Sequence, residues 1–65
     1  MITQEELSNG QQLIATNGKF DLWGEQTGTK GYYKLQYYND DKPAIIKYVT
    51  GIKEVRARAK RLNSL

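Results

Sequence analysis

The sequence contains neither cysteine nor histidine. Disulfide bridges are therefore excluded, as are the usual zinc ligands and catalysis by a thiol or an imidazole. No apolar run approaches the roughly 18 residues that a membrane-spanning helix needs, so we expect no membrane segment. The first residues, Met1–Glu6, carry acids and no basic side chain, which predicts the absence of a secretory leader. Together with the missing cysteines, these features are typical of a cytoplasmic protein.

The chain is also short. Its 65 residues suffice for one domain only, which we expect to cover residues 1–65. A domain of this size buries only about 60% of the surface that its unfolded chain exposes, so its stability is marginal. Small domains often gain stability from a disulfide, a metal or a partner subunit. With disulfides and zinc ligands excluded, the sequence predicts either good packing or association with another chain.

Charge is modest in amount but unevenly placed. The net charge is +3, from ten basic and seven acidic side chains. Between Lys53 and Arg61 there are five bases and one acid, a balance of +4, whereas the rest of the chain has five bases and six acids, a balance of −1. This cluster indicates either a solvated helix face, with cations at the end that the helix dipole favours, or a basic binding surface. On either interpretation Lys53, Arg56 and Lys60 are expected to point to water.

The first half of the chain predicts a short helix followed by a hairpin. Residues 3–6 form a capping box, in which a hydroxyl residue precedes a Glu by three positions, and Asn9-Gly10 ends the helix. Two interpretations compete for residues 11–16: a strand paired with residues 19–24 across the turn Asn17-Gly18, or the end of an N-terminal helix. The alternation of polar and apolar residues after the turn favours the strand.

The second half predicts two strands and a helix. Strand-like runs at 31–38 and 44–50 flank a polar turn at 39–43, and a basic helix follows from 51 to about 62. A polar loop with three glycines, residues 24–31, connects the two halves. The expected fold is therefore α+β, with an antiparallel sheet of three or four strands packed on one C-terminal helix.

Two sets of side chains are expected to form the contact between this sheet and this helix. The apolar stripe of the helix is Ile52, Val55, Ala59 and Leu62. The expected inward side chains of the sheet are Phe20, Leu22, Tyr33, Leu35 and Tyr37. The strand 44–50 is ambiguous, because Ile46 and Tyr48 on one face are as apolar as Ile45 and Val49 on the other.

Catalysis is not expected from this sequence. Asp40-Asp41 is the one carboxylate pair in a turn, where such residues usually bond to their own backbone. We predict no enzyme, no cofactor and no metal site.

The opposite face of the sheet is the candidate binding surface, because it combines aromatic rings with lysine and glutamine. Such a face can stack on unpaired bases, or it can enter the major groove of a duplex. The alternative partner is a protein, including a second copy of the chain. We expect nucleic acid, with DNA favoured over RNA. The candidate contacts, including two helix cations, are Lys19, Trp23, Tyr32, Lys34, Gln36, Tyr38, Lys47, Arg56 and Lys60.

The stretch from Lys30 to Leu62 resembles the small three-stranded-sheet-plus-helix domains of phage-type tyrosine recombinases, which bind arm sites, and of AP2-type plant factors. The resemblance rests on Gly31-Tyr32-Tyr33 at the start of a strand, the polar turn, Lys47 in the next strand and an alanine-containing helix. It implies a sheet that lies in the major groove of DNA. On this resemblance the base readers are Tyr32, Lys34, Gln36 and Lys47.

A second resemblance is to the ββα unit of a small bacterial domain family of unsettled function. It is carried by residues 18–23 followed by 31–33. Because two such units pair in that family, the resemblance implies a homodimer. The small size and the Tyr, Asn, Gln and Lys content also suit an accessory protein of a phage or mobile element that inhibits or adapts a host protein.

Overall fold

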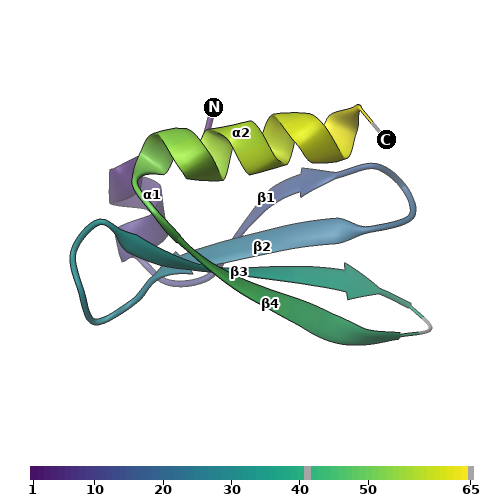
Figure 1. The fold of residues 1–65 in the computed structure, drawn as a ribbon, viewed down its shortest axis with the longest axis horizontal. Helices are drawn as coiled ribbons and strands as arrows, with labels where there is room; N and C mark the ends of the chain where they lie inside the picture. The colour runs from purple at the N-terminus through teal and green to yellow at the C-terminus, as the bar shows by residue number, and fades with distance from the viewer. Residues whose placement is uncertain (41, 65) are drawn as a thin grey trace.

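The computed structural model of the protein describes residues 1–40 and 42–64 and has two layers (Figure 1). A four-stranded antiparallel sheet forms one layer, and a C-terminal helix lies across one face of it. The strands follow one another in the order β1-β2-β3-β4. The predicted α+β fold is therefore confirmed. The elements are α1 (Gln4–Ser8), β1 (Gln12–Thr16), β2 (Asp21–Gln26), β3 (Tyr32–Asn39), β4 (Lys42–Thr50) and α2 (Ile52–Asn63).

The short helix α1 begins at the predicted capping box. The Thr3 hydroxyl oxygen accepts a hydrogen bond from the Glu6 backbone N–H at 3.2 Å and donates one to Glu6 Oε1 at 3.1 Å. A cap of this kind satisfies a backbone donor that the first turn leaves unpaired. The helix contacts β2 and places Leu7 in the core with no exposed surface. The N-terminal segment is therefore part of the packed domain.

The strand interpretation of residues 11–16 is confirmed, and the β1–β2 turn has a specific anchor. Asn17 Oδ1 accepts hydrogen bonds from the backbone N–H groups of Lys19, at 2.9 Å, and Phe20, at 2.7 Å. Asn17 Nδ2 donates to the Leu62 carbonyl oxygen at 3.4 Å. One side chain therefore holds the turn closed and ties it to the last turn of α2.

The predicted loop 24–31 is shorter than expected, because β2 continues to Gln26. Gly24 is buried rather than part of a flexible connection. A Cβ at this position would overlap Ile14 Cδ1 and lie 3.0 Å from Leu35 Cδ2. The glycine is thus needed for close packing, a role that its polar neighbours in the sequence conceal.

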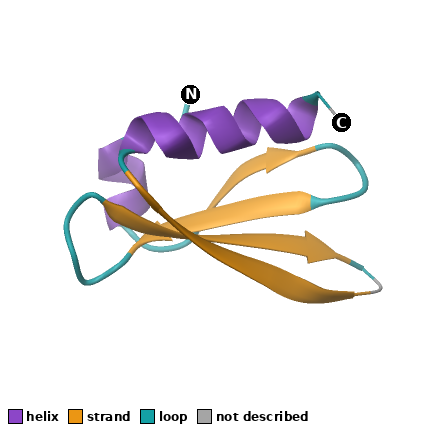
Figure 2. Ribbon diagram, in the orientation of Figure 1, coloured by secondary structure: helices purple, strands orange, loops and turns teal. Residues whose placement is uncertain are grey.

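The helix α2 starts at a glycine turn at the end of β4 (Figure 2). The Gly51 N–H donates to the Gly31 carbonyl at 2.8 Å, and both glycines have positive φ angles, +88° and +79°. This bond joins the start of α2 to the start of β3. The predicted apolar stripe faces the sheet as expected: Val55 and Leu62 are buried, and Ile52 and Ala59 pack against them.

The pairing of β3 with β4 decides which face of β4 is inside. Residues directly opposite each other in an antiparallel pair share a face, so the inward side chains of β3 identify those of β4. The pairs on the helix side are Tyr33 with Val49, Leu35 with Lys47, and Tyr37 with Ile45. Ile46 and Tyr48 therefore point away from α2.

The core lies between the sheet and the two helices. Its buried members are Leu7, Leu22, Tyr33, Leu35, Val49, Val55 and Leu62. In the described part of the chain, no helix has the length and the apolar character needed to span a membrane.

Candidate nucleic-acid interface

The face of the sheet that points away from α2 carries most of the predicted contacts. We call it the outer sheet face and define it by the strand register. It comprises Leu13, Thr16, Asp21, Trp23, Glu25, Tyr32, Lys34, Gln36, Tyr38, Ile46, Tyr48 and Thr50. No other described element covers it, and Leu13, Tyr32, Tyr38, Ile46 and Tyr48 are all exposed.

Five of the nine predicted contacts lie together on the outer sheet face, and the other four lie elsewhere. Those on the face are Trp23, Tyr32, Lys34, Gln36 and Tyr38. Lys19 lies in the exposed β1–β2 turn, whereas Arg56 and Lys60 lie on α2, in the opposite layer. The structure thus separates the aromatic residues from the cluster of helix cations.

The prediction that Lys47 shares a face with Lys34 is wrong. Lys47 is opposite Leu35 and therefore points to the helix side, where it lines a small depression with Phe20, Tyr37 and Arg58. The physical reason is the register, since Tyr37 pairs with Ile45 and every second residue of β4 follows on the same face. Lys47 cannot act with Lys34 as a reader on one surface.

Two tyrosines form the best defined contact of the outer sheet face. The rings of Tyr32 and Tyr48 stack with their centroids 5.7 Å apart and their planes 14° apart. Lys34 is directly opposite Tyr48 on the neighbouring strand. Tyr48 was not among the predicted contacts, because the sequence left the orientation of its strand open.

Gln36 is held by its neighbours at the centre of the face. Its Oε1 accepts hydrogen bonds from Gln11 Nε2, at 2.5 Å, and from the Tyr38 hydroxyl, at 3.2 Å. These bonds orient the amide and leave its NH₂ group as the part that can donate to a ligand. Trp23 is directly opposite Gln36 and is half-buried.

The charge of the outer sheet face is low and slightly negative. Lys34 is its one cation among the described residues, and it lies directly opposite Glu25. Asp21, opposite Tyr38, adds a second carboxylate. A phosphate backbone therefore meets little positive charge on the sheet itself.

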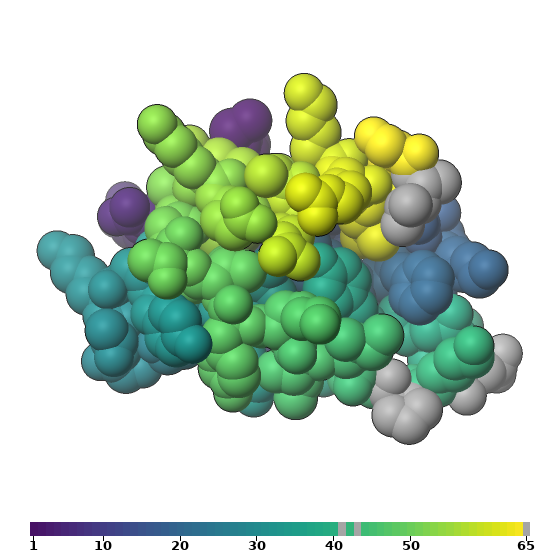
Figure 3. Space-filling model, in the orientation of Figure 1, coloured from purple at the N-terminus to yellow at the C-terminus, as the bar shows by residue number. Residues whose placement is uncertain are grey.

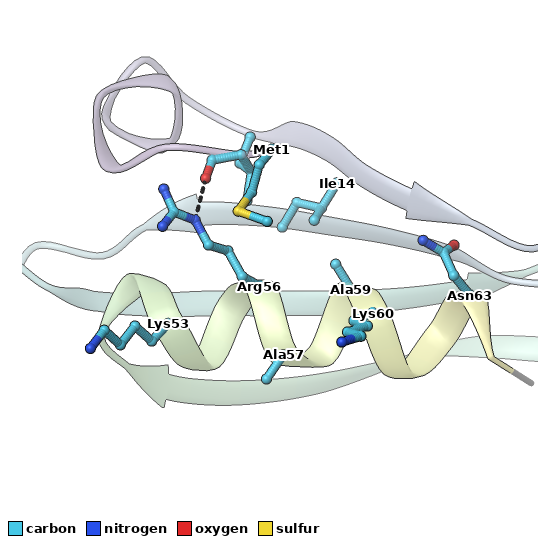
Figure 4. Close-up of a pocket in the computed structure, with 9 residues that line it drawn as sticks. Met1, Ile14, Lys53, Arg56, Ala57, Ala59, Lys60 and Asn63 are labelled. Atoms are coloured by element: carbon cyan, nitrogen blue, oxygen red, sulfur yellow. Dashed lines mark hydrogen bonds between the residues drawn. The ribbon is translucent and has the colours of Figure 1, made fainter.

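The helix cations belong to a separate surface. Arg56 was predicted to point to water, but it is half-buried, and its Nε donates to the Ile2 carbonyl oxygen at 2.9 Å. It lines a groove of about 540 Å³ between α2 and the N-terminal segment, with Lys53 and Lys60 at the rim and Ile14 on the far wall (Figure 4).

A further helix cation is engaged within the helix itself. Arg58 Nε donates to Glu54 Oε1 at 2.8 Å, one helical turn away. The pKa of Arg58 is raised above its usual value, mainly by the hydrogen bond to Glu54 and to a smaller extent by a hydrogen bond to Tyr37. Of the helix cations named here, Arg56 and Arg58 therefore have internal partners, and Lys53 and Lys60 are exposed.

Residues 1–40 and 42–64 contain no group of three acidic side chains placed to hold a metal ion. Of the carboxylate pair in the β3–β4 turn, Asp40 is exposed and Asp41 lies outside the described residues. No family model, no curated protein and no solved structure matches this chain.

Proposed function

We propose that this protein is a non-catalytic nucleic-acid-binding domain that stacks unpaired bases on its outer sheet face. The observation that carries the proposal is the set of four aromatic side chains that surround Lys34 and Gln36: Trp23, Tyr32, Tyr38 and Tyr48. Aromatic rings accept any base, and each such stacking contact contributes on the order of 1–3 kcal/mol to binding.

The low charge of the face favours unpaired bases over a duplex. Duplex binding depends strongly on phosphate contacts, and on this face Lys34 is accompanied by Asp21 and Glu25. Exposed cations lie instead beyond the two ends of β2, with Lys19 before it and Lys30 after it. A single strand that crosses the face can meet both lysines while its bases stack between them. Single-stranded DNA is the ligand that we propose first.

A protein-binding module is the second candidate, and a specific observation favours it. Leu13 and Ile46 are exposed on the same face as the aromatic rings, and the face carries few charges. Aromatic enrichment and charge depletion are typical of the centre of a protein interface. Under this proposal the protein is a small accessory protein of a phage or mobile element. It acts in the cytoplasm as an inhibitor or adaptor of a host protein.

Amide chemical-shift titration separates the two candidates. The labelled protein is titrated with a single-stranded DNA, an RNA of the same sequence and the corresponding duplex, at two salt concentrations. We expect the single strands to shift the amides of Trp23, Tyr32 and Tyr38, with a salt slope of about −0.7 per phosphate neutralised. If none of the three ligands shifts these amides at low salt, the nucleic-acid proposal is wrong and the protein candidate takes its place.

Two lysines on opposite faces provide a matched pair of variants. Lys34→Gln removes a cation from the outer sheet face, and Lys47→Gln removes one from the helix side of the sheet. The two variants have the same net charge, so long-range attraction falls equally in both. Lys34→Gln is expected to weaken single-strand binding clearly more than Lys47→Gln does. Equal losses would assign the effect to net charge alone.

A further inference from the structure

The groove between α2 and the N-terminal segment lies in the layer opposite the outer sheet face, and the proposed function makes no use of it. We call it the α2 groove. Figures 1 and 3 show the N-terminal segment behind α2, and Figure 4 shows the side chains that line the groove. Its volume of about 540 Å³ is within the range of roughly 300–1,000 Å³ that is typical of small-molecule sites.

The walls of the α2 groove are apolar and come from three separate segments. Ile2 belongs to the N-terminal segment, Ile14 to β1 and Ala59 to α2, and all three pack against the core. In Figure 4 the side chains of Ile14 and Ala59 point toward one another across the groove. Because Ala59 ends at Cβ, the helix leaves the space between them open. A hydrocarbon chain in this space would be removed from water on several sides, which favours its binding.

The charged side chains of the described lining are all basic. Lys53, Arg56 and Lys60 follow one another at spacings of three and four residues, so they share one face of α2. The Nε of Arg56 donates to the Ile2 carbonyl oxygen at 2.9 Å, which holds the side chain in place. Its two Nη groups donate to no residue in the described part of the chain. They are therefore oriented donors for an anionic oxygen.

The lining supplies hydrogen-bond donors but few acceptors, which limits the class of ligand. Among the described lining residues, the Asn63 amide is the one side chain with an acceptor oxygen. The Ile2 carbonyl oxygen already accepts from Arg56. A peptide brings a backbone N–H donor with each carbonyl, and between apolar walls these donors would lose their partners. A carboxylate on a hydrocarbon chain brings acceptors only, so it matches both the charge and the walls.

We propose that the α2 groove binds one free, single-chain fatty acid. Its carboxylate accepts hydrogen bonds from Arg56 and Lys53, and its chain runs along α2 past Ala59 toward Ile14. Figure 4 sets this orientation, because the two cations lie at one end of the groove and the apolar walls lie farther along it. The aliphatic stem of Lys60 can cover the chain while its ammonium group stays in water. This inference goes beyond the proposed nucleic-acid binding and does not depend on it.

The chain length of the ligand tests the apolar walls. The wild-type protein is titrated with hexanoate, octanoate and decanoate below their micellar concentrations, and the isoleucine methyl shifts are followed. We expect shifts at Ile2 and Ile14 and none at Ile45 and Ile46, which are exposed elsewhere on the surface. The Kd is expected to fall about fourfold for each CH₂ that enters the groove. An affinity independent of chain length, or shifts confined to Ile45 and Ile46, would overturn the proposal.

The head group tests the cations. Octanol carries the same chain as octanoate without the carboxylate, and it is expected to bind about tenfold more weakly. Lys53→Gln and Arg61→Gln each remove one exposed cation of α2, but only Lys53 lines the groove. Lys53→Gln is expected to weaken octanoate binding about two- to fivefold more than Arg61→Gln does. Equal binding of octanol and octanoate, or equal losses in the two variants, would overturn the carboxylate site.

Two larger ligands separate a free fatty acid from other anionic partners. A peptide rich in glutamate and leucine, and vesicles that contain phosphatidylglycerol, are both expected to leave the Ile2 and Ile14 methyl groups unshifted. If either ligand shifts them while decanoate does not, the groove docks that partner and the fatty-acid proposal is wrong. The response of the Trp23 amide to single-stranded DNA is measured on the same samples. It reports on the outer sheet face alone, so failure of one proposal is distinguishable from failure of the other.

Discussion

Ile14 lies against Gly24 on the neighbouring strand, at the point where the helix side of the sheet is most tightly packed. A Cβ at Gly24 would overlap Ile14 Cδ1 and lie 3.0 Å from Leu35 Cδ2. Leu35 is fully buried and cannot move away freely. The missing side chain of Gly24 is therefore what allows the bulged strand β1 to close over the core.

Gly24→Val is expected to lower the free energy of unfolding by about 1–3 kcal/mol, because it overpacks this contact. Gly28→Val is the matched control, since a Cβ at Gly28 meets nothing within 4 Å and its φ angle is not in the left-handed region. Urea denaturation followed by tryptophan fluorescence measures both. Equal stability of the two variants would contradict the packing role of Gly24.

Thr3→Ala is expected to cost about 1 kcal/mol, because it removes the cap of α1. For a domain of this size that corresponds to a fall in Tm of roughly 4–8 °C. Thr3→Ser keeps the hydroxyl and is expected to retain most of the stability. Thermal melts followed by circular dichroism make the comparison. A Tm unchanged by Thr3→Ala would mean that α1 contributes little to the fold.

Asn17→Ala is expected to destabilise the protein by on the order of 1–3 kcal/mol, because two backbone donors lose their acceptor and the turn loses its bond to the Leu62 carbonyl. Asn17→Asp keeps the acceptor, loses the Nδ2 donor and places a negative charge near the C-terminal end of α2, which the helix dipole disfavours. Its loss is expected to be smaller than that of Asn17→Ala. Chemical denaturation gives the order, and the reverse order would show that the helix link matters more than the turn.

The double variant Lys53→Gln, Lys60→Gln is expected to leave the site of single-strand binding unchanged. Both lysines are exposed on α2, in the layer opposite the outer sheet face. Their loss lowers long-range attraction, so affinity falls slightly and equally for all ligands. Shift mapping of the variant with single-stranded DNA checks this. Loss of the shifts at Trp23 and Tyr32 would place the binding surface on the helix instead.

Much of the local structure could be predicted because neighbouring residues carry the signals. The cap at Thr3, the Asn17-Gly18 turn and the stripe from Ile52 to Leu62 each depend on spacings within a few residues. Five members of the outer sheet face followed from alternation in β2 and β3 once Leu22 and Tyr33 were assigned to the core. The nucleic-acid role of these residues stays a prediction.

Other features depended on contacts between distant segments. Gly24 looked like part of a polar loop, and only the approach of Ile14 from β1 explains why no side chain fits there. Arg56 was expected in water, but the Ile2 carbonyl, which is 54 positions away, accepts its Nε hydrogen bond. A pattern of neighbouring residues could predict neither contact, because Ile14 and the Ile2 carbonyl are distant in the sequence from Gly24 and Arg56.

The sequence by itself determined the element order, the absence of disulfides and the helix face that packs, because these depend on composition and short-range periodicity. The tertiary structure alone decided the orientation of β4, since its two faces are equally apolar and only the register with β3 distinguishes them. That register turns Lys47 toward the helix and leaves Ile46 and Tyr48 outside. It thereby separates the aromatic face from the basic helix.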